Sequence, residues 1–90
     1  MDLQEFSEKF KTLASKEKIK FIYEQIHNLK GREKISFLLS TIKDEKTSSL
    51  VRTTALKLLS QTSFEESTIY QEYTKDPSQA VAKAAKKALK

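Results

Sequence analysis

The sequence offers few side chains that could carry out a reaction. His27 is the only histidine and there is no cysteine, so neither a histidine pair nor a thiolate set can hold a metal ion. The single glycine leaves no glycine-rich loop to cradle a phosphate. No serine stands in a setting where a histidine could activate it as a nucleophile. We therefore expect a protein that is not an enzyme, with no cofactor and no metal site.

Lysine is the functional side chain that the sequence supplies in quantity. The formal net charge is +5, with 17 Lys and Arg against 12 Asp and Glu. Residues 46–90 hold eight basic and four acidic side chains, whereas residues 1–45 hold nine and eight. Such a gradient indicates contact with an acidic protein or with nucleic acid. The alternative is a solvated helix face, because lysine is favoured near helix C-termini.

A repeat of thirty residues predicts where these lysines lie. The segments 20–29, 50–59 and 80–89 align without a gap. Hydrophobic residues share the columns Phe21–Val51–Val81 and Leu29–Leu59–Leu89. A period near thirty is typical of helical repeat arrays, in which each unit buries its apolar face by stacking on its neighbours.

The spacing of hydrophobic residues predicts six helices with short connections, so that neighbouring helices run antiparallel. Paired in order, they form one domain of three hairpins, 3–29, 32–60 and 64–90. The predicted fold class is all-α, an α-α superhelix (solenoid) of these three antiparallel hairpins. A plain helical bundle is the alternative.

Capping signals mark several of the expected helix ends. The residues expected to cap helix N-termini are Asp2, Ser15, Ser63 and Asp76. Pro77 is then expected to be the first residue of the last helix. Gly31 is placed to end the second helix in a left-handed conformation.

The second and third hairpins share a pattern. Asp44 precedes Val51-Arg52-x-x-Ala55-x-x-Leu58-Leu59, and Asp76-Pro77 precedes Val81-x-x-x-Ala85-x-x-Ala88-Leu89. Over residues 44–90 this resembles the HEAT repeat, in the short form found in phycobilisome-lyase-like proteins. The third hairpin departs from it by having Ala82 where the second has Arg52, and the first hairpin keeps only the hydrophobic positions.

The resemblance implies structural roles for four residues, which are Asp44, Arg52, Asp76 and Pro77. It implies that Arg52 bonds to the Asp44 side of the turn between the two helices of its hairpin. It also implies that the second helices of the hairpins lie side by side and line a concave face.

On that face the exposed positions form three columns, which are Tyr23–Thr53–Lys83, His27–Lys57–Lys87 and Lys30–Ser60–Lys90. These nine positions include five lysines and no acidic residue. Such a strip suits an acidic peptide, an acidic helix or a phosphate backbone. The competing interpretation is that the lysines only solvate the outer faces of amphipathic helices.

The function that we expect is a non-catalytic scaffold or adaptor that binds an acidic partner segment on a basic concave face. The alternative is a nucleic-acid-binding or regulatory module that uses the same lysines. A third interpretation is self-association through helix 78–90, where an alanine-rich stripe lets another helix approach closely. The absence of cysteine, signal peptide and long apolar run predicts a cytoplasmic protein without a membrane partner.

Overall fold

The computed structural model describes residues 2–62, 64 and 66–89. Throughout this part of the chain the regular elements are helical, and six of them are α-helices. They are α1 (Leu3–Lys11), α2 (Ser15–Gln25), α3 (Gly31–Lys43), α4 (Ser49–Ser60), α5 (Ser67–Tyr73) and α6 (Gln79–Ala88), with a 3₁₀ turn η1 (Ile26–Asn28) after α2. The all-α class and the six helices are therefore confirmed.

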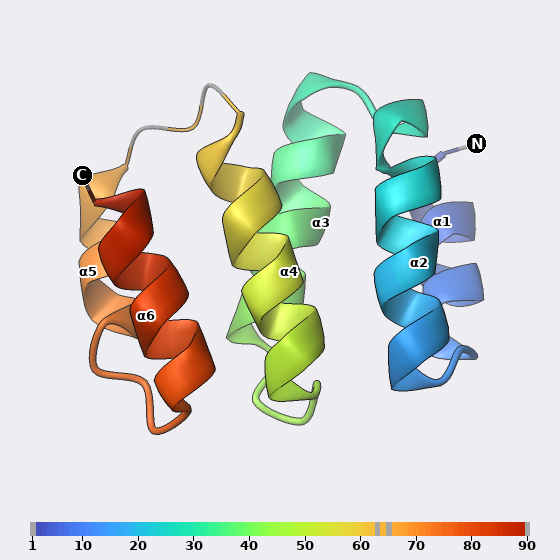
Figure 1. Cartoon of the computed structure of the whole chain (residues 1–90). Coiled ribbons are helices and arrows are strands. Elements are labelled where there is room, and N and C mark those ends of the chain that lie inside the picture. The colour runs from blue at the N-terminus through green and yellow to red at the C-terminus, as the bar shows by residue number, and fades with distance from the viewer. Residues whose placement is uncertain (1, 63, 65, 90) are drawn as a thin grey trace.

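The helices form two layers. α2, α4 and α6 lie side by side at the front of Figure 1, and α1, α3 and α5 lie behind them. α4 is the central helix, because it packs against α2, α3 and α6. The resulting slab measures 32 × 26 × 17 Å, and the two ends of the chain lie at opposite ends of the row.

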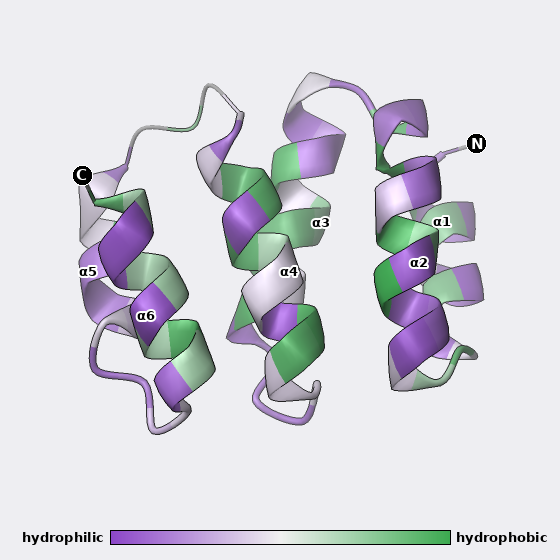
Figure 2. Ribbon diagram, in the orientation of Figure 1, coloured by the Kyte–Doolittle hydropathy of each residue, from purple (hydrophilic) through white to green (hydrophobic). Residues whose placement is uncertain are grey.

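One hydrophobic core lies between the layers, and its residues follow the thirty-residue repeat. Val51 and Val81 are fully buried, as are Ala55 and Ala85, one helical turn later in α4 and α6. Figure 2 shows hydrophobic and hydrophilic residues alternating around each front helix, as expected for amphipathic helices that bury one face. The columns that align in the sequence are thus the positions that pack.

Phenylalanine rings form the core at the N-terminal end. The fully buried ring of Phe6 lies 4.8 Å from that of Phe21 and 4.6 Å from that of Phe37, measured between ring centroids. Phe10 meets Phe37 edge-to-face at 5.0 Å. Tilted and edge-to-face contacts at these distances are favourable beyond the area that they bury. This aromatic cluster joins α1, α2 and α3.

The expected cap at Asp2 is confirmed, whereas Gly31 has the expected left-handed conformation but does not end the second helix. The Asp2 carboxylate caps α1 by accepting the N–H of Glu5 at 2.9 Å. Gly31 has a φ of +47°, the left-handed conformation that glycine adopts without strain. It stands at the start of α3 rather than directly after α2, because α2 gives way to η1 and two extended residues first.

Other expected caps are wrong. Ala14, not Ser15, is the N-cap residue of α2, and the Glu17 carboxylate accepts its N–H at 3.2 Å. Asp76 and Pro77 precede α6, whose N-cap is Ser78. The Ser63 cap falls outside the described residues.

Serines thirty residues apart occupy the same place in the second and third hairpins. The Ser48 hydroxyl accepts the N–H of Val51 at 3.4 Å, and the Ser78 hydroxyl accepts that of Val81 at 3.5 Å. A serine hydroxyl at the N-cap satisfies one of the helix's orphan donors. The N-cap serine is therefore part of the thirty-residue repeat.

Candidate functional site

A groove of about 440 Å³ lies between α4 and α6 on the front layer. Its lining residues are Thr53, Lys57 and Ser60 of α4 and Ala80, Lys83, Ala84, Lys87 and Ala88 of α6. We call it the α4–α6 groove. Five of its eight residues belong to the columns predicted from the repeat, which are Thr53, Lys57, Ser60, Lys83 and Lys87.

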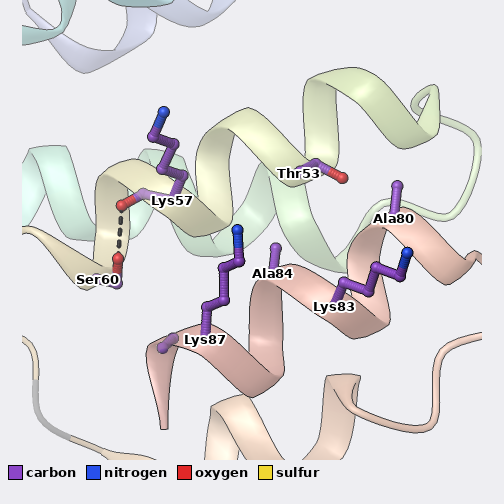
Figure 3. A pocket seen from close by; sticks show the side chains of 8 residues that line it. Thr53, Lys57, Ser60, Ala80, Lys83, Ala84 and Lys87 are labelled. Atoms are coloured by element: carbon purple, nitrogen blue, oxygen red, sulfur yellow. Dashed lines mark hydrogen bonds between the residues drawn. The ribbon is translucent and has the colours of Figure 1, made fainter. Parts of the chain in front are cut away.

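The α4–α6 groove has an alanine floor and a lysine rim. In Figure 3, Ala80 and Ala84 project from α6 towards α4, while Lys83 and Lys87 extend from α6 beside them. Lys57 extends from the opposite wall, and its backbone carbonyl accepts the Ser60 hydroxyl at 2.7 Å. The Lys57, Lys83 and Lys87 side chains are exposed. Two lysines of α6 and one of α4 therefore flank an apolar strip, and the ammonium group of Lys57 points away from α6 in Figure 3.

Acidic side chains do not neutralise this rim within the described residues. There the one ion pair of the chain joins Arg52 to Asp76, and neither belongs to the α4–α6 groove. Like charges gathered on one surface repel each other unless a counter-charge is present. The rim is therefore a local concentration of positive charge.

The predicted positions of the first hairpin do not reach this groove. Tyr23 on α2 is 49 % exposed, and His27 is exposed on η1. Lys30 is extended and precedes α3, so its column does not continue across the hairpins as a helical position. The helical register is lost before Lys30 because α2 ends at Gln25, whereas α4 continues to Ser60. Lys90 is outside the described residues.

The alanine stripe of the last helix is divided between the core and the groove. Ala85 is fully buried, and Ala84 and Ala88 are half-buried against the core. Ala80 is exposed at the start of α6, where it lines the α4–α6 groove. The stripe thus faces α4, and the surface it leaves open belongs to the groove.

Arg52 is buried near the start of α4, where it contacts the turn that precedes α6. Its Nε donates to the carbonyl of Ile42 at 2.8 Å, and its Nη1 and Nη2 donate to the Asp76 carboxylate at 3.4 and 2.7 Å. The guanidinium also lies 6.0 Å from the centre of the Tyr73 ring. One side chain of α4 thereby ties the end of α3 to the turn before α6.

The expected link between Arg52 and the Asp44 side of its turn is correct only for the backbone. The Ile42 carbonyl accepts from Arg52, but the carboxylate partner is Asp76 of the next hairpin. Asp44 instead accepts the N–H of Lys46 at 3.0 Å. The connection between hairpins, 24 residues away in sequence, was not visible in the spacing.

Asp76 stays ionised in this setting. Burial raises the pKa of its carboxyl group, but the hydrogen bonds from Arg52 and from the N–H of Ser78, together with the Arg52 charge, lower it further, so the net pKa is below the usual value. Because Arg52 and Asp76 satisfy each other, the charge that remains in the hollow beside exposed Pro77 is that of Glu45. Arg52 and Asp76 thus make structural contacts, and the role expected for Pro77 stays a prediction.

No family model, no curated protein and no solved structure matches this chain. The resemblance to HEAT repeats therefore stays a prediction, as does the superhelical twist. Within the described residues, no helix combines the length and the apolar character needed to cross a membrane.

Proposed function

We propose that this chain is a non-catalytic interaction module, HEAT-like in its repeat, that binds an acidic partner segment in the α4–α6 groove. The observation that carries the proposal is the rim of Lys57, Lys83 and Lys87, which has no acidic counterpart among the described residues. A complementary negative segment relieves the repulsion within the rim and gains from its charge.

The alanine floor supports a protein partner over a nucleic acid. Phosphate groups would meet the lysines but leave the floor formed by Ala80, Ala84 and Ala88 uncovered. Sequence-tolerant binding of single strands also relies on several exposed aromatic rings. In the described part of the chain the exposed large hydrophobic side chains are Tyr23 and Leu50, so only one of them is aromatic.

The test compares a fluorescent glutamate-rich peptide and a fluorescent DNA duplex by anisotropy, at low and at physiological salt. The groove variant K57E/K83E/K87E is matched by K9E/K11E/K16E, which reverses three exposed lysines of the first hairpin and changes the net charge equally. We expect the groove variant to weaken peptide binding by at least about tenfold, and the matched variant by no more than about twofold.

Equal weakening by the two variants would mean that total charge, not the groove, attracts the peptide. Duplex binding tighter than peptide binding, with an affinity that falls on the order of tenfold or more between about 50 and about 200 mM salt, would assign the same lysines to nucleic acid. Either result overturns the proposal.

A further inference from the structure

We infer that the partner segment binds the α4–α6 groove as an α-helix with an apolar stripe and acidic flanks. This inference rests on the proposed function and specifies its ligand. It starts from the groove floor, where Ala80, Ala84 and Ala88 are spaced by four residues and so lie on one side of α6.

The walls of the groove cannot satisfy the backbone of an extended peptide. Both are α-helices, whose N–H and C=O groups within each helix bond to one another. An extended segment would therefore place unpaired backbone groups against alanine methyl groups, at a cost for each one that is buried. A helical segment satisfies its own backbone before it docks.

The polar side chains of the groove walls also cannot supply the hydrogen bonds that an extended peptide would need. The Ser60 hydroxyl already donates to the Lys57 carbonyl. The Thr53 hydroxyl oxygen is buried and has no hydrogen-bond partner within the described residues, and a single such group cannot pair a whole strand. An extended peptide thus lacks the ladder of partners that strand addition requires.

Small side chains on α6 also suit a helix. Alanines at successive turns let a second helix approach closely, because interhelical distance depends on side-chain size at the contact. Thirty residues earlier, α4 has the larger side chains Leu50, Thr54 and Leu58 at the equivalent positions. The open floor is therefore a property of α6.

Charge sets the flanks of the partner helix. Lys83 and Lys87 are one helical turn apart on one wall, and Lys57 stands on the other. Acidic residues four apart on one flank of the partner, with another on the opposite flank, match this arrangement. Leucine or alanine between the flanks covers the floor and removes apolar surface from water.

The experiment uses a capped peptide of about 16 residues made of Glu, Leu and Ala, long enough to be partly helical alone, with glutamates flanking an apolar stripe. A control peptide is identical except that proline replaces one central alanine, which breaks the helix. We expect the proline peptide to bind at least about fivefold more weakly to the unmodified protein.

Two protein variants locate the contact. Ala80→Leu narrows the floor at an exposed position, and Gln79→Leu adds the same side chain to the neighbouring exposed position outside the groove. We expect Ala80→Leu, but not Gln79→Leu, to weaken binding of the helical peptide. Circular dichroism of each variant checks that the helices remain intact.

The outcomes separate this inference from the proposed function. Equal binding of the helical and proline peptides, lost in K57E/K83E/K87E, overturns the helical ligand and leaves an acidic segment as the partner. Binding of neither peptide, with no binding of the glutamate-rich peptide either, overturns both. A mass that rises with protein concentration and falls with Ala80→Leu assigns the groove to a second copy of the chain, which also overturns the inference.

Discussion

The two junctions between neighbouring hairpins are held by different kinds of contact. Between the first and second hairpins, aromatic rings interlock, with Phe6 and Phe10 against Phe37. Between the second and third, a buried ion pair joins Arg52 to Asp76 beside small packed residues such as Val81 and Ala85. The same thirty-residue spacing is compatible with both.

The two junctions also differ in the open space on the front layer. Aromatic rings fill the first junction with hydrophobic volume. In the second, Arg52 and Asp76 connect the hairpins at one end, and the alanines of α6 leave space above the core. The α4–α6 groove lies at this second junction, where α6 has alanines on its surface.

The aromatic junction is expected to be the more sensitive of the two to truncation. Phe6→Ala removes a fully buried ring with two aromatic neighbours and leaves a cavity. We expect a loss of about 4 kcal/mol in the free energy of unfolding, measured by urea denaturation followed by circular dichroism. Phe6→Leu, which keeps most of the volume, should lose clearly less. Equal losses in the two variants would contradict a role for the ring contacts.

Truncation at the polar junction is expected to cost nearly as much stability. Asp76→Ala leaves the buried Arg52 guanidinium without its counter-charge, and we expect a loss of about 3 kcal/mol in the same experiment. Asp44→Ala is the matched control, because exposed Asp44 bonds only a neighbouring N–H within the described residues, and should cost less than about 1 kcal/mol. If Asp44→Ala were the more damaging change, the assignment of Arg52's partner would be wrong.

Acid should remove the stability that the Arg52–Asp76 contact contributes, but not the stability that the aromatic junction contributes. The folded-state pKa of Asp76 lies below its ordinary value of about 3.9, so its contribution is fully present above that pH and is lost as pH falls through the folded-state pKa. The stability difference between the unmodified protein and Asp76→Ala should therefore be constant from about pH 7 to about pH 5 and shrink below about pH 4. Urea midpoints at each pH measure it. A difference that persists undiminished in strong acid would show that Asp76 stabilises without ionising.

Local sequence patterns predicted most of the fold. Hydrophobic spacing located all six helices, and the aligned columns contain Val51 and Val81, which are both fully buried. Helix ends were predicted less well. Asp76 has the residue type of an N-cap, yet its carboxylate bonds Arg52 and the N–H of Ser78, and Ser78 caps α6 instead. The preference of aspartate for the N-cap reflects neighbouring residues only, so it could not predict that Arg52 would bind the Asp76 carboxylate.

The candidate site was predicted for two hairpins and not for the first. The columns placed Thr53, Lys57 and Lys83 where the α4–α6 groove has them. They failed at Lys30, because the shorter α2 and its 3₁₀ turn interrupt the register that the alignment assumed. An ungapped alignment records spacing along the chain, not the point at which a helix ends.

The sequence by itself determined the helices, their period, the faces they bury and the excess of lysine in the second half of the chain. These properties depend on neighbours within a few turns, where side-chain spacing alone decides which face is apolar. The tertiary structure decided which carboxylate meets Arg52, and which of the lysines share one groove. Those choices depend on how separate hairpins dock, and docking is set by the sizes of side chains that are far apart in the chain.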